Sequence, residues 1–326
     1  MNKTIGIFGG GQLGRMMAQA ALPLNIQCTF FEVDTDCPAA ILGTVFSTKS
    51  EQGLQDFIAS ADVFSLEFEN TPINYVDVLT QSKTLHPPRL ALATAQNRLA
   101  EKALFDELNI PVAPYRAVDS LDSLKQAVVD LGLPIVLKTV TGGYDGKGQF
   151  VLRTENQIDT AWAELGPAKS LVAESFVQFS REVSIIAVRG QNGDVKTWSL
   201  AENHHHNGIL SHSIVPAPNS ADLQPVAQDY ITRLLNHLNY VGVLTLELFV
   251  TEQGLFANEM ACRVHNSGHW SIEGAVCSQF ENHIRAVAGL PLGLTEVIRP
   301  TVMINIIGQH PKSEAVLALN GAHLHL

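Results

Sequence analysis

The stretch Thr141-Gly142-Gly143-Tyr144-Asp145-Gly146-Lys147-Gly148-Gln149 decides the fold that we expect for this chain. The apolar segment 134–138, which ends at Lys138, predicts a strand before it, and segment 149–152 predicts a return strand after it. Glycines let a backbone turn tightly and bring its N–H groups close to an anion. With two lysines nearby, this hairpin is suited to cover a polyphosphate, and a plain surface hairpin is the alternative. It is not a Walker loop, because no Gly-Lys-Ser/Thr opens a helix.

Composition bounds the possible functions of the chain. Its 326 residues are 46% hydrophobic and 16% charged, which indicates a globular protein with room for about two domains. The formal net charge of -11 argues against a general binder of nucleic acids or membrane surfaces. Four cysteines without CxxC spacing predict free thiols and, with no visible signal peptide, a cytoplasmic location. No apolar run reaches the ~20 residues of a membrane-spanning helix.

The N-terminal part has the pattern of a parallel sheet covered by helices. Residues 4–8 predict a strand that enters Gly9-Gly10-Gly11-Gln12-Leu13-Gly14 and then an apolar helix. A second predicted strand, 28–31, ends at Glu32, where dinucleotide-binding folds place an acid that binds ribose. Taken alone, this pattern favours a dinucleotide site. Strands and helices continue to alternate until consecutive prolines at 87–88.

The middle of the chain predicts a smaller α+β unit. Apolar spacing from Thr94 to Leu108 predicts one helix, and Ser120 is the expected N-cap of a second helix that ends near Leu131. The glycine-rich hairpin, a helix near 155–165 and another strand complete the unit. Beyond it, long strands dominate.

Two glutamates interrupt apolar strands that form a predicted hairpin. Between the strands, Glu252-Gln253-Gly254 matches a three-residue loop with a left-handed final residue. That loop sets Thr251 opposite Leu255, and therefore Glu247 opposite Glu259, with Cβ atoms roughly 5 Å apart. Such a pair is costly unless a cation lies between the carboxylates, and Mg²⁺ is suited to that position. The alternatives are that one glutamate faces solvent or that a lysine pairs with them.

Two further polar runs carry possible chemistry. Arg263, His265 and Asn266 follow the second glutamate strand and together offer charge and donors for a small planar oxyanion. The run His204-His205-His206, together with His212, suggests zinc. Consecutive histidines alternate faces on a strand, so at most part of that run can share a metal ion.

These features together resemble the ATP-grasp superfamily: a strand lysine, a glycine hairpin, an acid-ended strand at 174–177 and the glutamate pair. Within it, GGGQLGRM at 9–16, TGGYDGKGQ at 141–149 and RVHNSGHW at 263–270 resemble the 5-(carboxyamino)imidazole ribonucleotide synthetases of purine biosynthesis. The resemblance covers the whole chain in order. It implies an α/β and α+β protein with an ATP-grasp fold. The implied parts are an N-terminal Rossmann-like domain at 1–98, a central subdomain with a glycine-rich lid at 99–181 and a C-terminal subdomain at 182–326.

The resemblance also implies a set of site residues, with MgATP between the central and C-terminal subdomains. The implied ATP-binding residues are Arg98, Lys138, Gly143, Tyr144, Asp145, Gly146, Lys147, Gly148, Gln149, Glu174, Ser175, Phe176, Val177, Glu182, His205, Asn258 and Glu259. Glu247 and Glu259 are expected to hold Mg²⁺, and Arg263, His265 and Asn266 to seat bicarbonate as catalytic residues. The implied ribonucleotide-binding residues are Gly11, Gln12, Leu13, Glu69, Tyr144, Asp145 and Lys147.

The implied reaction is an ATP- and bicarbonate-dependent carboxylation of the exocyclic amine of 5-aminoimidazole ribonucleotide through carboxyphosphate. The resemblance further implies a homodimer that acts on small molecules. The alternatives are another ATP-grasp ligase, such as a formate-dependent transformylase or a biotin-dependent carboxylase, an inactive nucleotide-binding module, and a nicotinamide-dependent oxidoreductase that uses Glu32.

The sequence departs from the family pattern at two places. Cys262 stands where the family usually has proline. The chain stops in Ala322-His323-Leu324-His325-Leu326, whose alternation predicts a strand, whereas the family continues with a basic segment that helps to hold the ribonucleotide phosphate. We therefore expect the natural protein to be longer and the C-terminal subdomain to lack its final segment.

Overall fold

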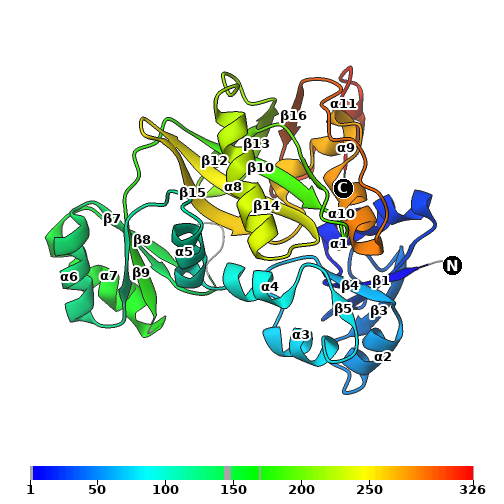
Figure 1. Cartoon of the computed structure of the whole chain (residues 1–326), viewed down its shortest axis with the longest axis horizontal. Coiled ribbons are helices and arrows are strands. Elements are labelled where there is room, and N and C mark those ends of the chain that lie inside the picture. The colour runs from blue at the N-terminus through cyan, green and yellow to red at the C-terminus, as the bar shows by residue number, and fades with distance from the viewer. Residues whose placement is uncertain (1–2, 143–147, 169, 326) are drawn as a thin grey trace.

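The computed structural model describes residues 3–142, 148–168 and 170–325. Within these residues the strands form a five-stranded, a four-stranded and a seven-stranded sheet, called here the N-terminal, central and C-terminal sheets. Figure 1 shows the central sheet at one end of the molecule, the N-terminal sheet at the other, and the C-terminal sheet between them. The predicted combination of α/β and α+β parts is confirmed.

The N-terminal sheet is parallel and has the strand order β3-β2-β1-β4-β5. Its strands are β1 (Thr4–Phe8), β2 (Gln27–Glu32), β3 (Gly43–Ser47), β4 (Val63–Leu66) and β5 (Thr84–Leu85). The helices of this part are α1 (Gln12–Ala21), η1 (Leu22–Leu24), α2 (Gly53–Ala59), α3 (Ile73–Leu79) and α4 (Arg89–Ala95). Strand order reverses between β1 and β4, and ligands of such sheets bind outside the carboxyl ends of the strands at that point.

The single helix predicted from Thr94 to Leu108 is wrong. The structure has two helices there, because α4 ends at Ala95 and α5 (Arg98–Glu107) begins after Asn97. The Asn97 side-chain oxygen accepts hydrogen bonds from two α5 backbone N–H groups, each at 3.1 Å. Asparagine is a strong N-cap, so it starts a new helix although the apolar spacing continues.

The central sheet is antiparallel, with the order β6-β9-β7-β8. Its strands are β6 (Tyr115–Val118), β7 (Ile135–Thr139), β8 (Gln149–Leu152) and β9 (Leu171–Ser175), and its helices are α6 (Leu121–Leu131), η2 (Glu155–Gln157), α7 (Ile158–Leu165) and η3 (Gly166–Ala168). Ser120 caps α6 as predicted, accepting from the Ser123 N–H at 3.2 Å. Strands β7 and β8 form the predicted hairpin, and residues 143–147 between them lie outside the described residues.

The C-terminal sheet has the order β15-β14-β10-β12-β13-β16, with β11 also paired to β10. Its strands are β10 (Arg181–Arg189), β11 (Val195–Thr197), β12 (Ala201–His206), β13 (Ile209–Val215), β14 (Gly242–Thr251), β15 (Gly254–Ala261) and β16 (Thr301–Ile304). The helices here are α8 (Leu223–His237), η4 (Asn266–Gly268), α9 (Ser271–Gly274), α10 (Gln279–Ala288) and α11 (Ser313–Leu317). Alternate residues of β10 face opposite ways: Ile185 packs in a core with α8, and Ile186 in a core with α10.

The hairpin of β14 and β15 contains the predicted glutamate pair, but its turn differs from the predicted one. Thr251 pairs with Gly254 rather than with Leu255, so the predicted loop is wrong by one residue. A bulge then places one extra residue, Asn258, on β15 between the two segments of regular pairing. This extra residue restores the predicted register, and Glu247 stands directly opposite Glu259.

A buried histidine joins the N-terminal sheet to the C-terminal one. His283 of α10 accepts a hydrogen bond at Nδ1 from the Val243 N–H at 3.1 Å, and its Nε2 lies 2.7 Å from Ser65 Oγ of β4. Because Nδ1 accepts from a backbone N–H, the proton is on Nε2, which donates to the serine. Burial lowers the pKa of His283 to about 3, so the ring stays neutral.

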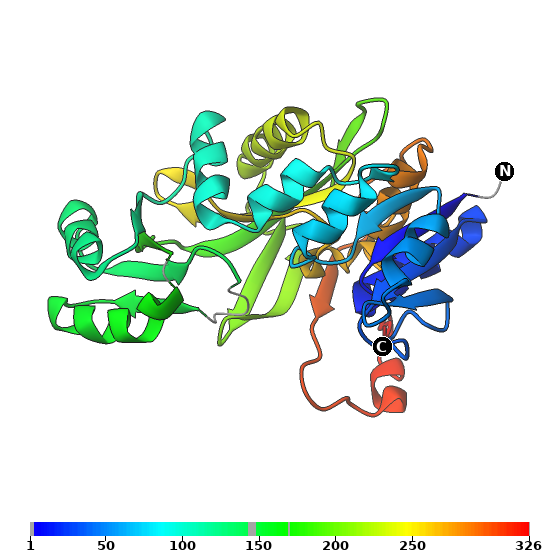
Figure 2. The same ribbon diagram turned by 90° about the horizontal axis from the view of Figure 1, so that it is seen from below.

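The C-terminal residues return toward the N-terminal part. Residues of α11 and of the chain end line a cavity together with α1, and Figure 2 shows both below the N-terminal part. The strand predicted at the chain end is wrong for residues 322–325, which form no regular secondary structure. No helix in the described part of the chain is long and apolar enough to cross a membrane.

We expect Asn97→Ala to lower the free energy of unfolding by about 1 kcal/mol, since it leaves two N–H groups of α5 without their acceptor. Asn97→Asp is the matched control, because aspartate keeps a capping oxygen at the same position. Urea denaturation followed by circular dichroism measures both variants. Equal stability of Asn97→Ala and Asn97→Asp would contradict the capping role.

Candidate active site

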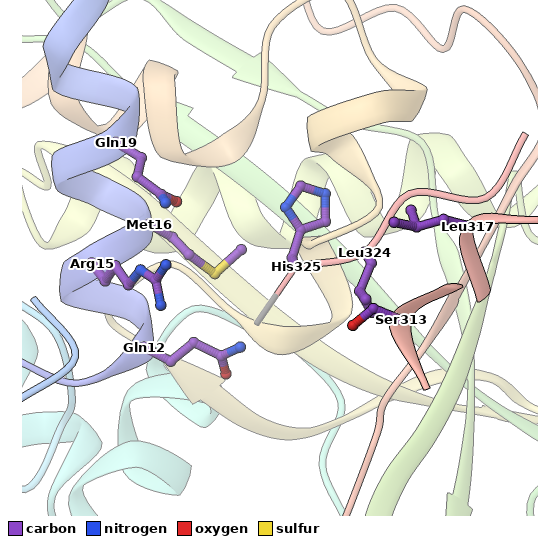
Figure 3. Close-up of a pocket in the computed structure, with 8 residues that line it drawn as sticks. All are labelled: Gln12, Arg15, Met16, Gln19, Ser313, Leu317, Leu324 and His325. Atoms are coloured by element: carbon purple, nitrogen blue, oxygen red, sulfur yellow. The ribbon is translucent and has the colours of Figure 1, made fainter. Parts of the chain in front are cut away.

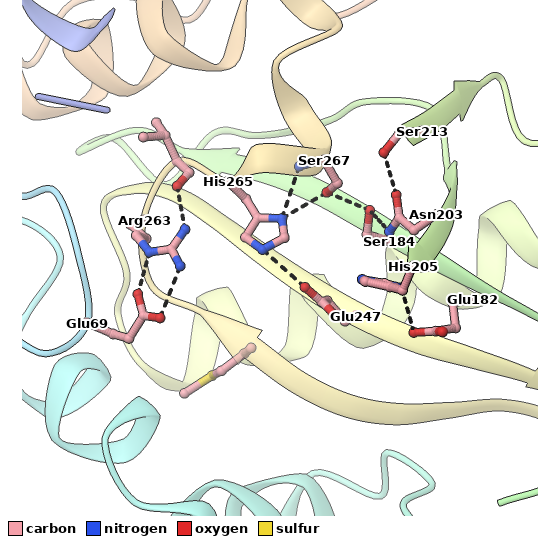
Figure 4. A network of polar contacts seen from close by, with 12 residues as sticks. Glu69, Glu182, Ser184, Asn203, His205, Ser213, Glu247, Arg263, His265 and Ser267 are labelled. Atoms are coloured by element: carbon pink, nitrogen blue, oxygen red, sulfur yellow. Dashed lines mark hydrogen bonds and ion pairs between the residues drawn. The ribbon is translucent and has the colours of Figure 1, made fainter. Parts of the chain in front are cut away.

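One face of the C-terminal sheet changes from apolar to polar along its strands. On β10, Ser184 occupies the face that carries Ile186 further along. Glu247 of β14 lies directly opposite Ser184 on one side and Glu259 of β15 on the other. Cross-strand neighbours share a face, so these polar residues form a row across three strands. Figure 4 shows Ser184 and Glu247 of this row beneath the loop that follows β15.

The two glutamates of this row have different protonation tendencies. Burial opposes ionisation of Glu247, but the hydrogen bond from His265, with Nε2 at 3.1 Å from Oε1, and the positive charges of His265, His205 and Arg263 together outweigh it and lower the pKa. The pKa of Glu259 is raised, first by the protein atoms packed around it and then by the facing Glu247 carboxylate. Solvent still reaches the Glu259 side chain, as it must if that carboxylate is to meet an incoming cation. A cation placed between them would stabilise both ionised forms.

The donor set fits a magnesium ion that is completed by a ligand. Glu247, Glu259 and the Asn258 amide oxygen are hard oxygen donors, which Mg²⁺ prefers. No group of three or more histidines, cysteines, aspartates or glutamates in the described residues could hold a metal ion by itself. Mg²⁺ characteristically takes one or two carboxylates and fills its remaining positions with phosphate oxygens and water, so two carboxylates suffice.

A buried triad of charges lies between α5 and the central sheet. Lys102 of α5 and Lys138 of β7 each place Nζ 3.1 Å from Glu174 Oε2. Burial opposes ionisation of Glu174, but the two ammonium groups outweigh it and lower its pKa. Glu174 Oε1 is buried and has no hydrogen-bond partner among the described residues. Glu174 therefore has one oxygen engaged and one available to a ligand.

Helix α5 contributes two charged residues that sequence reasoning did not single out as functional. Lys102 is only 1% exposed, and Glu101 beside it is 3% exposed. The Glu101 carboxylate accepts from the Met260 N–H of β15 at 2.7 Å, and burial together with nearby Glu259 raises its pKa to about 8. The predicted Arg98 begins the same helix and donates to the Thr139 carbonyl at 3.0 Å. Nothing in the sequence around Lys102 or Glu101 indicates a functional role, because the residues that they contact lie far away in the sequence.

The loop after β15 is tied to the N-terminal sheet. The Arg263 guanidinium forms a two-pronged ion pair with Glu69, with Nη2 at 3.0 Å from Oε1, and also donates to the Val264 carbonyl. Arg263 lowers the pKa of Glu69 against the effect of burial. The predicted oxyanion residue Arg263 thus contacts a predicted ribonucleotide residue. Asn266, the third predicted catalytic residue, begins η4, and its Oδ1 is buried without a partner among the described residues.

The glycine turn after β1 is occupied by carboxylates of the same chain. Glu67 accepts from the N–H groups of Gly11 at 2.7 Å and Leu13 at 3.0 Å. Glu32 accepts from the Gly10 N–H at 3.0 Å. In a dinucleotide site these amides would face a pyrophosphate, and the acid after β2 would face a ribose. The turn therefore has the dinucleotide pattern, but the N–H groups of Gly10, Gly11 and Leu13 already donate to carboxylates of the same chain.

The remaining predicted residues have varied surroundings. Gln12 points into a cavity of about 390 Å³ between α1 and the chain end, shown in Figure 3. The other residues lining that cavity are Arg15, Met16, Gln19, Ser313, Leu317, Leu324 and His325. His205 and Glu182 are brought together, with Nδ1 at 3.3 Å from Oε2, and this hydrogen bond raises the pKa of His205. His204 stacks on His212 with ring centroids 4.3 Å apart, which is packing rather than a zinc site.

The residues predicted for adenine follow one another at the end of β9. Ser175 donates its N–H to the Pro114 carbonyl at 2.8 Å, and Phe176 donates its N–H to the Pro134 carbonyl at 3.1 Å. Val177 follows directly, outside the strand. Gly148 and Gln149 lie at the start of β8, next to Lys138. The predicted lid residues Gly143, Tyr144, Asp145, Gly146 and Lys147 lie outside the described residues.

Two family models cover most of the chain. The ATP-grasp domain matches residues 103–280, and the ribonucleotide synthetase preATP-grasp domain matches residues 1–96. The N5-carboxyaminoimidazole ribonucleotide synthase of Pseudomonas aeruginosa is 45% identical over 323 residues, which are 98% of this chain and 89% of that protein. The chain belongs to the N5-carboxyaminoimidazole ribonucleotide synthase family. The family predicted from the motifs is thereby confirmed, and the chain is an ATP-grasp ligase.

Solved structures of this family have the same fold. The N5-carboxyaminoimidazole ribonucleotide synthetase of Thermus thermophilus superposes with a TM-score of 0.93 at 44% identity, covering 98% of this chain and 88% of that one. The enzyme of Aspergillus clavatus, solved with ADP and 5-aminoimidazole ribonucleotide, gives a TM-score of 0.87 at 28% identity, covering 94% and 83%. The predicted ATP-grasp fold is confirmed, and the nicotinamide-dependent alternative is wrong.

We expect Lys102→Met to lower the free energy of unfolding by about 3 kcal/mol, the low end of the cost of breaking a buried ion pair, since Glu174 keeps Lys138. Lys125→Met is the matched control, because Lys125 lies exposed on α6 and should change stability by less than about 0.5 kcal/mol. Urea denaturation measures both. Equal stability of the two variants would show that the buried triad contributes nothing.

Proposed function

We propose that this chain carboxylates the exocyclic amine of 5-aminoimidazole ribonucleotide with ATP and bicarbonate, as a step of purine biosynthesis. One observation carries the proposal: Glu247 stands opposite Glu259 on a polar sheet face, and the charges of Lys138 and Arg98 are near enough to Glu259 to oppose the rise in its pKa. Two acids with basic groups beside them form a place for a metal-bound polyphosphate. The ligands named for the Aspergillus relative, ADP and 5-aminoimidazole ribonucleotide, support the same choice of substrates.

We assign ATP to the space between the central and C-terminal sheets. Lys138 and Arg98 would face its phosphates, together with the lid residues 143–149. Glu174 to Val177 would contact the adenine edge, where the unpartnered Glu174 Oε1 can accept from an amino group. Glu182 and His205, already in contact, would face the ribose hydroxyls. Glu247 and Glu259, assisted by Asn258, would hold Mg²⁺, which when bound neutralises charge on the phosphates.

We place bicarbonate beside Arg263, His265 and Asn266. His265 is anchored to Glu247 through Nε2, so it lies at the metal-binding row. Arg263 holds Glu69 in the described state and carries a charge that suits a small anion. The Asn266 side chain adds an amide to the same loop. This loop would therefore bring the oxyanion next to the terminal phosphate.

We place the ribonucleotide at the carboxyl ends of β1 and β4. Gly11, Gln12 and Leu13 lie there, and Glu69 follows β4 and reaches Arg263. This is the reversal point of strand order, where parallel sheets bind ligands. The lid residues Tyr144, Asp145 and Lys147 complete the proposed contacts, although they lie outside the described residues.

The proposed chemistry has two steps. A bicarbonate oxygen attacks the γ-phosphorus, the bond to the β-phosphate oxygen breaks, and ADP and carboxyphosphate result. The carboxyl group then passes to the amine, either directly or as CO₂, the amine loses a proton and phosphate leaves. The task of the chain is to position the three substrates, to neutralise charge and to keep water from the mixed anhydride.

Three organisational features belong to the same proposal. We divide the chain into 1–98, 99–181 and 182–326, the three parts that the resemblance implies. A homodimer is the proposed assembly, which light scattering on the purified protein would test. A cytoplasmic location is proposed as well, and the cysteines of the described chain are free thiols, as a reducing compartment would keep them.

Phosphate release with single omissions tests the proposed reaction. We expect release from ATP to require bicarbonate, and the carboxylated ribonucleotide to form only when 5-aminoimidazole ribonucleotide is also present. Release that needs formate instead of bicarbonate would contradict the proposal in favour of a transformylase.

We expect Arg263→Ala to lower the rate of bicarbonate-dependent phosphate release by about a hundredfold, as for loss of one charged donor to a reacting oxyanion. ATP affinity, measured by fluorescence titration, should stay unchanged. Arg89→Ala at the exposed start of α4 is the control and should leave both quantities unchanged. A parallel loss of ATP affinity in Arg263→Ala would move this residue into the nucleotide site.

A further inference from the structure

A continuous chain of hydrogen bonds runs behind His265, and the proposed chemistry does not use it. Ser213 Oγ donates to Asn203 Oδ1 at 2.7 Å, and Asn203 Nδ2 donates to Ser184 Oγ at 3.0 Å. Ser184 Oγ donates to Ser267 Oγ at 2.8 Å, and Ser267 Oγ lies 2.9 Å from His265 Nδ1. Figure 4 shows the whole chain, from β13 through β12 and β10 to the loop after β15.

The members of this chain depend on one another because they are buried. Ser184, Ser213 and Ser267 are fully buried, and Asn203 is 6% exposed. A buried hydroxyl or amide that loses its partner keeps the cost of desolvation without compensation. Each hydroxyl therefore has to donate to one neighbour and accept from the other, and the chain has a direction.

One group at the His265 end fixes that direction. The Ser267 backbone N–H also points at His265 Nδ1, at 3.3 Å. A backbone N–H can only donate, so Nδ1 has to accept and cannot carry a proton. Exchanging the oxygen and nitrogen of Asn203 would reverse the chain and require a proton on Nδ1, which the Ser267 N–H opposes.

We infer that Asn203, Ser184 and Ser267 are positioning residues that hold His265 as the tautomer with its proton on Nε2. That nitrogen faces Glu247 Oε1 at 3.1 Å, so the ring donates a hydrogen bond into the site and takes no proton there. An unprotonated Nε2 would turn a lone pair toward a carboxylate and toward any anionic substrate. The role for a bound oxyanion rests on the proposed function, whereas the tautomer itself does not.

Nitrogen-15 NMR of histidine-labelled protein without ligands tests the tautomer directly. The chemical shifts of the two ring nitrogens report which of them carries the proton, and His265→Asn assigns the signals by their loss. We expect an unprotonated Nδ1 and a protonated Nε2 for His265. A protonated Nδ1 in the wild-type protein would overturn the inference, whether or not the protein proves to be a carboxylating ligase.

A matched pair of serine variants tests the positioning role. Ser267→Ala and Ser213→Ala each remove one fully buried hydroxyl, so their effects on stability should be similar. Only Ser267→Ala removes the hydroxyl that donates to His265 Nδ1, because Asn203 still donates to Ser184 when Ser213 is replaced. We expect Ser267→Ala, which keeps the backbone N–H at 3.3 Å but loses the hydroxyl donor at 2.9 Å, to shift the His265 Nδ1 signal without protonating it, and Ser213→Ala to leave the His265 signals in place.

Kinetics of the same variants separate this role from a merely structural one. We expect Ser267→Ala to lower kcat for bicarbonate-dependent phosphate release about tenfold, the low end for a residue that orients a functional histidine, with KM for ATP unchanged. Ser213→Ala should keep the wild-type kcat. Equal losses in both variants, or a Ser267→Ala protein with wild-type spectrum and kcat, would overturn the inference. A wild-type protein without this activity would contradict the proposed function, and the NMR result would still decide the tautomer.

Discussion

Two carboxylates face each other across β14 and β15, and their repulsion is the constraint around which the site is arranged. The hydrogen bond from His265 helps to keep Glu247 ionised, while the pKa of Glu259 is raised and the nearby charges of Lys138 and Arg98 oppose that rise. His265 follows β15 of the C-terminal sheet, Lys138 lies in β7 of the central sheet, and Arg98 begins α5 between the N-terminal and central sheets. A cation between the carboxylates would replace repulsion with attraction, and this is why we propose the pair as the metal site.

Carboxylates also join the parts of the molecule to one another, in a chain whose formal net charge is -11. Glu67 fills the glycine turn after β1, and Glu69 joins the N-terminal sheet to Arg263 of the C-terminal loop. Glu101 fastens α5 to β15, and Glu174 fastens α5 to the central sheet through Lys102. Each of these acids accepts from a fixed donor and so positions a neighbouring site residue. These contacts therefore join the three sheets to one another at the candidate site.

The sequence predicts the parts of this structure that depend on local patterns. Strand, glycine turn and helix at β1 and α1, the hairpin of β7 and β8, and the cap at Ser120 follow from neighbouring residues. The Glu247–Glu259 pair was predicted through a wrong turn, since local turn chemistry fits either loop length and only the bulge at Asn258 restores the register. The burial of Lys102 and the filling of the glycine turn by Glu67 depend on partners distant in sequence, so periodicity cannot reveal them.

The most direct test of the central claim, that the facing carboxylates form the metal site, is binding of Mn²⁺ as a substitute for Mg²⁺. Electron paramagnetic resonance in the presence of ADP measures its affinity for the wild-type protein and for Glu247→Gln, Glu259→Gln and Glu252→Gln. Glu252 lies exposed in the turn of the same hairpin and serves as the matched control. The account predicts that Glu247→Gln and Glu259→Gln each lose most of the Mn²⁺ affinity while Glu252→Gln retains it. Equal affinity in all four proteins would contradict it.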